Sequence, residues 1–198
     1  MKLLLTSAGF LNKGVSDIFL QLLNKPVEQI SIIFIPTASR TEEEIKYVNK
    51  SKQELVNLGI KNITTLNLDH KITADEIKNV DVIYICGGNT FYLLQKIRES
   101  CLDRLLLNYD GLYVGVSAGS IVAGPNIEIA SPGDENDIGL SDLTGMKLVD
   151  FAVAPHYQME DQAVIDELKN QVDYEIVTLT DNQAVLAENG ARKIIGLI

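Results

Sequence analysis

Two nearly continuous apolar runs, at residues 30–36 and 80–86, limit what this chain can fold into more than any other feature of its sequence. A strand that is apolar at every position must be buried on both faces, which is typical of a parallel sheet covered by helices on each side. Other apolar segments alternate with stretches of helical periodicity along the chain. This alternation predicts an α/β fold, a doubly wound and mostly parallel sheet with helices on both faces.

The individual elements can be placed from periodicity, caps and breakers. We expect strands at 2–7, 30–36, 62–67, 80–86 and 112–116, and helices at 15–23, 42–58, 73–79, 90–100 and directly after Ser117. The segment 126–142 is rich in Gly, Pro, Ser, Asn and Asp, and we expect a long ordered loop there. Near the end, the segments 183–187 and 191–197 flank an Asn-Gly pair, which predicts a C-terminal hairpin.

The composition of the chain limits its domain count, its partners and its location. The 198 residues, 46% of them hydrophobic, suffice for one packed domain, and without a repeat or linker we expect a single domain over 1–198. The net charge of -10 argues against nucleic-acid or anionic-membrane partners, and the apolar runs are too short to span a bilayer. We therefore expect a cytoplasmic protein. Cys86 and Cys101 are expected to be reduced packing residues, and with two histidines no metal or cofactor is expected.

The pentapeptide 115–119, Gly-Val-Ser-Ala-Gly, follows an apolar run and precedes a segment that can open a helix. A Gly-x-Ser-x-Gly sequence between a strand and a helix is typical of a sharp turn that exposes a nucleophilic serine. Side chains at Gly115 or Gly119 would collide with the strand or the helix in such a turn. Ser117 is therefore the candidate nucleophile.

Other candidate residues follow apolar runs, where the carboxyl ends of parallel strands form ligand sites. His156 comes after one such run and is the candidate general base, whereas His70 lies in a polar stretch and is expected to be an exposed loop residue. Negative charge that develops on a substrate carbonyl needs backbone N–H donors, which Ala118 and the side-chain-free Gly88 could supply. The acid that orients His156 stays open on spacing alone among Glu128, Asp134, Glu135, Asp137 and Asp142.

Three motifs in the same order, Gly-Gly-Asn-Thr-Phe with a Leu-Leu pair (87–94), Gly-x-Ser-Ala-Gly (115–119) and Pro-His (155–156), resemble the aspartyl dipeptidase family, peptidase E. Cyanophycinases are more distant relatives. The resemblance implies a fold like that of class I glutamine amidotransferases and an acid in the loop before His156, with Asp134 preferred and Glu135 and Asp137 as alternatives. It assigns the following roles: Ser117 nucleophile, His156 base, Gly88 and Ala118 oxyanion hole, and Gly87, Asn89 and Thr90 substrate binding.

One departure from the family concerns specificity. In peptidase E an arginine-bearing stretch after the catalytic histidine is thought to bind the substrate aspartate, but residues 157–162 contain no arginine here. Arg40, after another strand end, is the alternative source of positive charge.

The expected function is that of a cytoplasmic serine peptidase acting on short peptides, aspartyl dipeptidase-like, through an acyl-enzyme. An exposed sheet edge would allow a homodimer. A hydrolase of another amide or isopeptide and a non-catalytic binding protein are the alternatives. A glutamine amidotransferase is disfavoured because serine, not cysteine, occupies residue 117.

Overall fold

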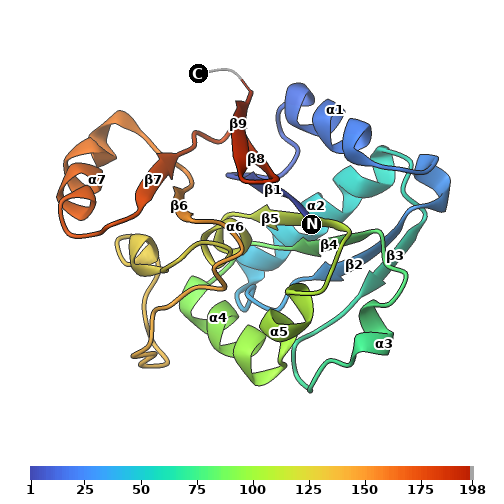
Figure 1. Ribbon diagram of the computed structural model, residues 1–198, viewed down its shortest axis with the longest axis horizontal. Coiled ribbons are helices and arrows are strands. Elements are labelled where there is room, and N and C mark those ends of the chain that lie inside the picture. The colour runs from blue at the N-terminus through green and yellow to red at the C-terminus, as the bar shows by residue number, and fades with distance from the viewer. Residues whose placement is uncertain (197–198) are drawn as a thin grey trace.

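The computed structural model describes residues 1–196 and contains a seven-stranded sheet with helices on both faces (Figure 1). The strand order is β3-β2-β4-β5-β1-β8-β9, in which the first five strands are parallel and the last two antiparallel. These strands are β1 (Lys2–Thr6), β2 (Ser31–Ile35), β3 (Asn62–Thr65), β4 (Val82–Ile85), β5 (Leu112–Val116), β8 (Ala184–Glu188) and β9 (Ala191–Ile195). The helices are α1 (Lys13–Leu22), α2 (Glu42–Asn57), α3 (Ala74–Ile77), α4 (Thr90–Glu99), α5 (Leu102–Leu106), α6 (Ala118–Ile121) and α7 (Gln162–Lys169).

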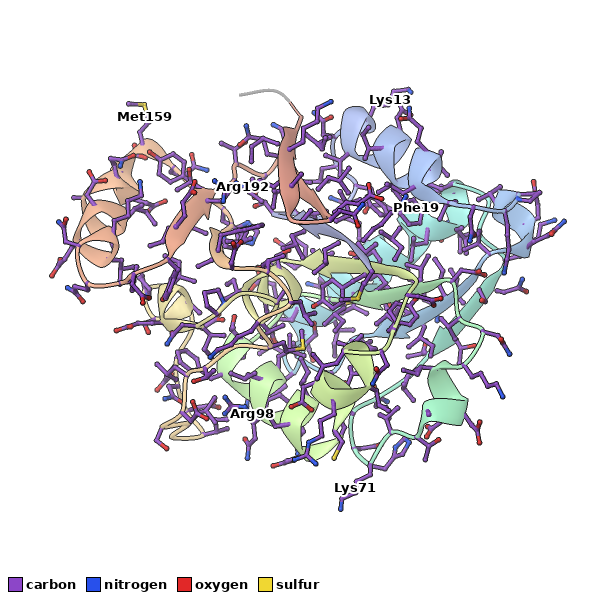
Figure 2. All side chains as sticks on the ribbon, viewed as in Figure 1. Lys13, Phe19, Lys71, Arg98, Met159 and Arg192 are labelled. Carbon is purple, nitrogen blue, oxygen red and sulfur yellow. The ribbon has the colours of Figure 1, made fainter. Side chains whose placement is uncertain are left out.

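Alternate residues of the central strands point into two separate cores, one on each face of the sheet. Phe34 of β2 packs in the cluster that contains Phe19 of α1 and Leu55 of α2, and Phe19 lies on the sheet side of α1 (Figure 2). Its neighbour Ile33 packs in the other cluster, which contains Leu94 of α4. Because both faces of the strand are covered, every position must be apolar, as the sequence indicated.

The structure confirms the predicted α/β class and the C-terminal hairpin, in which β8 and β9 pair around Asn189 and Gly190. The predicted second strand of that hairpin included Leu197, which lies outside the described residues. The predicted helix at 90–100 ends where Cys101 adopts a left-handed φ of 62°, after which α5 begins. Within residues 1–196, no helix is both long and apolar enough to cross a membrane. The single-domain assignment stays a prediction.

The last third of the chain forms a second, small sheet that the sequence did not reveal. It consists of the parallel strands β6 (Phe151–Ala154) and β7 (Glu175–Thr178), which are connected through a 3-10 turn at Met159–Asp161 and α7. Another 3-10 turn, at Glu128–Ala130, precedes β6 in the chain. Ala152, Ile165 and Ile176 form its own small core. The apolar run before His156 is therefore a strand of this small sheet rather than of the main sheet.

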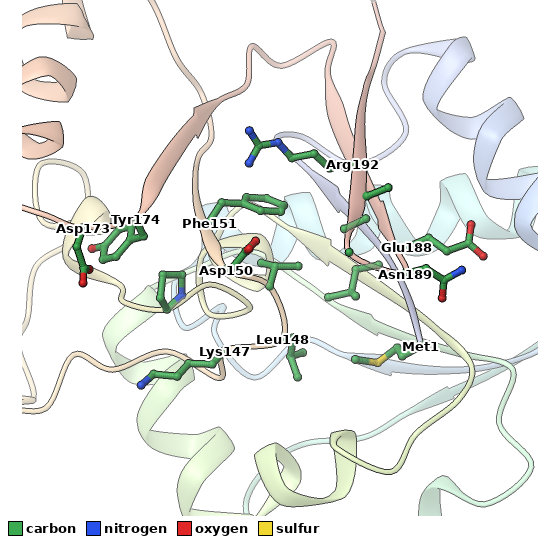
Figure 3. Close-up of a pocket in the computed structure, with 16 residues that line it drawn as sticks. Met1, Lys147, Leu148, Asp150, Phe151, Asp173, Tyr174, Glu188, Asn189 and Arg192 are labelled. Atoms are coloured by element: carbon green, nitrogen blue, oxygen red, sulfur yellow. The ribbon is translucent and has the colours of Figure 1, made fainter.

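A cleft of about 850 Å³ separates the small sheet from the hairpin, near the start of β1 (Figure 3). Arg192 of β9 reaches across it, forms an ion pair with Glu175 of β7 and lies 5.1 Å from the centre of the Phe151 ring. These contacts hold the small sheet against the main sheet at the end opposite the candidate site.

Candidate active site

Ser117 occupies a strained turn between β5 and α6. Its φ of 50° and ψ of -111° are unusual for a residue with a side chain, and this conformation is typical of a nucleophile elbow. The flanking glycines are required by close backbone approach: a Cβ at Gly115 would lie 2.5 Å from the Gly119 carbonyl oxygen, and a Cβ at Gly119 would lie 2.3 Å from the Ile85 carbonyl oxygen. The predicted reason for both glycines is thereby confirmed.

Ser117 contacts His156, the residue that the sequence singled out as its partner. The distance from His156 Nε2 to Ser117 Oγ is 2.9 Å. The other ring nitrogen, Nδ1, lies 2.6 Å from Oδ1 of Asp181, in the loop after β7. A serine, a histidine and a carboxylate thus form a continuous hydrogen-bonded row, the arrangement in which an imidazole can remove the serine proton.

Ser7, at the end of β1, fixes the position of His156. Its hydroxyl accepts a hydrogen bond from the backbone N–H of His156 at 2.7 Å and donates one to Asp181 Oδ1 at 3.0 Å. His156 has a left-handed φ of 58°, so its backbone needs such support. Ser7 therefore joins the strand end of the main sheet to the two residues that the small sheet supplies.

The structure corrects the preference for Asp134 as the partner of His156. Because β6 and β7 are adjacent and parallel, their carboxyl ends bring His156 and Asp181 together. Asp134 instead lies at the start of α4, where its Oδ2 accepts a hydrogen bond of 2.8 Å from the Thr90 N–H. The carboxylate follows the histidine in sequence, whereas the predicted candidates all lie in the loop that precedes it.

The alternatives to Asp134 are also engaged elsewhere. Glu135 contributes its backbone carbonyl to Asn89, and Asp137 forms a two-fold hydrogen-bonded ion pair with Arg40 at 2.9 and 3.1 Å. The Arg40 guanidinium lowers the pKa of Asp137 and also lies over the Tyr92 ring. Arg40 is therefore occupied and does not line either cavity next to Ser117. Of the remaining candidates, Glu128 and Asp142 are exposed in the long loop, and His70 is exposed as predicted.

Gly88 lines the larger of the cavities beside Ser117, and Ala118 directly follows Ser117 in the chain. No hydrogen bond among residues 1–196 uses the backbone N–H of either residue as a donor, so both are free for a ligand. Gly88 has a φ of 129°, and a Cβ on it would lie 2.3 Å from the Ala38 carbonyl oxygen. Only glycine fits this position, which allows the loop after β4 to approach Ser117 closely.

The rest of this loop holds Gly88 in place. The Ser39 hydroxyl donates to the Gly87 carbonyl at 2.8 Å, and the Asn89 side chain caps α4 by accepting from the Tyr92 N–H. Asn89 and Thr90 are buried and do not line either cavity next to Ser117, whereas Gly87 does. Of the three residues predicted to bind substrate, only Gly87 thus faces the space in front of the serine.

Two cavities flank Ser117 and His156. One, of about 380 Å³, extends between the turn after β1 and α2, and Gly88 and Asp181 also line it. The other, of about 280 Å³, is bounded by apolar side chains such as Ile121 and Ile165, with Asp134 among its polar residues. Ser117 and His156 therefore lie between two small cavities.

The buried thiol of Cys86 also lines the larger cavity, but burial raises its pKa strongly. A thiol with such a pKa stays protonated and is a poor nucleophile, which leaves the serine as the reactive group. Cys86 and Cys101 are both free, as predicted. Within residues 1–196, no group of three or more His, Cys, Asp or Glu side chains is placed to hold a metal ion.

We expect Asp134→Ala to act on the loop that carries Gly88, because it leaves the Thr90 N–H without its acceptor. The free energy of unfolding should fall by about 1–2 kcal/mol, as for a lost helix cap, and kcat should fall about 10- to 100-fold as Gly88 shifts. Thermal denaturation and steady-state kinetics on the same preparation measure the two effects. A stable variant with activity as low as that of a Ser117 variant would instead make Asp134 part of the reacting group.

Fold and site together define an α/β protein with a serine-hydrolase arrangement. The profile of Peptidase family S51 matches residues 3–195. An uncharacterized peptidase of Listeria innocua is 37% identical over 79% of this chain and 77% of its own length, and one of Pasteurella multocida is 32% identical over 99% and 98%. A crystal structure of "a Putative Peptidase E Protein" from Listeria monocytogenes superposes with a TM-score of 0.84 at 29% identity, covering 100% of this chain and 98% of that one.

The chain belongs to peptidase family S51. It is accordingly a serine-type peptidase, a hydrolase, and the resemblance to peptidase E seen in its motifs is confirmed.

Proposed function

We propose that this protein hydrolyses short peptides through an acyl-enzyme on Ser117, with His156 as general base and Asp181 as the acid that orients it. The observation that carries the proposal is the continuous row of contacts from Ser117 Oγ through the His156 ring to Asp181. Family membership and the name of the similar crystal structure, a peptidase E, support the peptidase activity.

The reaction begins when His156 Nε2 takes the proton of Ser117 and the serine oxygen attacks the scissile carbonyl. The N–H groups of Gly88 and Ala118 stabilise the negative charge on the carbonyl oxygen. His156 then gives its proton to the leaving amine as the C–N bond breaks, which leaves an ester on Ser117. A water molecule, deprotonated by the same imidazole, attacks the ester and restores the serine hydroxyl. No metal or cofactor takes part in these steps, and that absence stays a prediction.

The proposed substrates are short because the space around the serine is small. Cavities of about 380 and 280 Å³ on its two sides suit a few residues rather than a folded chain. The preference for aspartate that the family resemblance implies has less support, since Arg40 is paired with Asp137 and the only Lys or Arg of the described residues that lines either cavity is the exposed Lys50. A homodimer stays a prediction.

Covalent labelling with a biotinylated fluorophosphonate tests the proposal. We expect one label per chain, carried by Ser117 in peptide mapping, and no label on the Ser117→Ala variant. Ser141→Ala is the matched control, because Ser141 is exposed and distant in sequence from the elbow. Liquid chromatography of a dipeptide panel with Asp, Glu, Asn, Gly, Lys or β-linked aspartate in first place then identifies the bond that is cleaved.

Labelling that is equal in the wild type and Ser117→Ala would contradict the assignment of the nucleophile. A folded protein that neither reacts with the phosphonate nor cleaves any peptide would favour the alternative of a binding protein on the same fold.

A further inference from the structure

The larger cavity next to Ser117 ends at a carboxylate that the reaction does not use. Glu54, on α2, lines this cavity together with Ser51, and the turn after β1 forms the facing wall through Ala8. The Glu54 side chain is partly buried and forms none of the ion pairs found among residues 1–196. Its one hydrogen bond is a long one, 3.3 Å from the Phe10 N–H to Oε2.

Glu54 and Ser51, which line the cavity, lie near Gly9 together with the Tyr84 hydroxyl. A Cβ built on Gly9 would lie 3.3 Å from Glu54 Oε2, 3.4 Å from the Tyr84 hydroxyl oxygen and 3.9 Å from Ser51 Oγ. The Tyr84 side chain is completely buried and does not line the cavity, and its hydroxyl faces the Ser51 side chain.

The charges that face the cavity are mainly negative. Besides Glu54, they are the carboxylates of Glu44 and Asp181, the imidazole of His156 and the ammonium of Lys50. Asp181 is engaged with His156, and Glu44 accepts the backbone N–H groups of Arg40 and Thr41 at the start of α2. Lys50 is exposed on the helix surface. Burial raises the pKa of Glu54, and this effect outweighs the opposing effects of the Phe10 N–H and of the Lys50 charge.

Resting on the proposed function, we propose that Glu54 binds a positively charged group of the substrate. The cation is an ammonium or guanidinium, supplied by a basic side chain or by the α-amino group. Either cation would offset the charge of the partly buried Glu54 carboxylate, which forms no ion pair among the described residues.

The test uses diphenyl phosphonates that mimic an amino acid and react with the active serine. The lysine analogue is compared with the norleucine analogue, which has nearly the same shape without the side-chain charge. Free and N-acetylated norleucine analogues separately measure the contribution of the α-amino group. The readout is the second-order rate of Ser117 modification in the wild type, in Glu54→Gln and in Glu43→Gln, a control on the exposed face of the same helix.

We expect one of the two pairs to react about 10- to 100-fold faster in its cationic form, in the wild type and in Glu43→Gln, since a charged hydrogen bond has that effect. In Glu54→Gln the ratio should approach one, with a melting temperature equal to or above that of the wild type. The pair that responds identifies the source of the cation.

Several outcomes would overturn the inference. Ratios near one in the wild type, or ratios unchanged by Glu54→Gln, would mean that Glu54 does not recognise a cation. A lower melting temperature with uniformly slower reaction of all probes would mean that Glu54 only supports the turn at Phe10. Failure of every probe, including a simple fluorophosphonate, to modify Ser117 would instead refute the proposed function itself.

Discussion

Replacing Ser117 by alanine is expected to lower kcat on any cleaved peptide by about 10⁴- to 10⁶-fold, the largest effect of any side-chain change in this site. The variant keeps both cavities and the free N–H groups of Gly88 and Ala118, so the substrate should still bind with little change. Alanine also relieves none of the strain at φ 50°, and the melting temperature should stay close to that of the wild type. Kinetics with a sensitive chromatographic assay, together with thermal denaturation, measure both quantities.

The double variant Ser117→Ala/His156→Ala provides the control. Since the serine and the histidine act as one unit through their 2.9 Å contact, the second substitution should cost almost nothing further. A double variant that is much less active than Ser117→Ala would show that His156 acts on the substrate independently of the serine.

Replacing Asp181 by asparagine is expected to lower kcat by about 10⁴-fold. The carboxylate holds the proton of His156 on Nδ1 through a 2.6 Å contact and leaves Nε2 free to accept the serine proton. An asparagine can turn its NH₂ group toward Nδ1 and so favour the other tautomer, in which Nε2 carries the proton and cannot act as a base. Both side chains of the pair are about half exposed, at 52% and 49%, so the change in the free energy of unfolding should be small.

Asp137→Asn is the matched control, because it removes the ion pair with Arg40 and leaves His156 untouched. Its kcat should stay within a few-fold of the wild type. An Asp181→Asn variant that retains more than about a tenth of the wild-type kcat would show that the pairing with His156 contributes little to the reaction.

Much of the main sheet was predictable because a local apolar run in the sequence indicates each of its central strands. The apolar runs at 30–36 and 80–86, which contain β2 and β4, must be buried on both faces. The small sheet was not predictable in the same way. Nothing local in the sequence 151–154 states whether this strand pairs with the main sheet or with β7, because pairing depends on contacts between distant segments.

The site was predictable where the backbone itself demands particular residues. The turn at Ser117 needs glycines at 115 and 119, and the loop at Gly88 needs a residue without a side chain. These backbone requirements can therefore be recognised from the glycines in the sequence. The carboxylate that contacts His156 has no comparable backbone requirement, so the sequence does not identify it in the same way. Asp181 follows the short apolar strand β7, and that position at a strand end was the one available signal for it.

The small sheet makes the chemistry depend on how β6 and β7 pack against the main sheet, whose core they share through Phe151, Val153 and Val177. Ser117 and the free N–H groups belong to the main sheet, whereas His156 and Asp181 follow β6 and β7. Ser7 connects the two parts through its hydrogen bonds to His156 and Asp181. Local unfolding of the small sheet by heat or mild denaturant should therefore abolish the hydrolytic activity while the seven-stranded sheet is still folded. The hydrolytic activity would then report whether the small sheet is packed against the seven-stranded sheet.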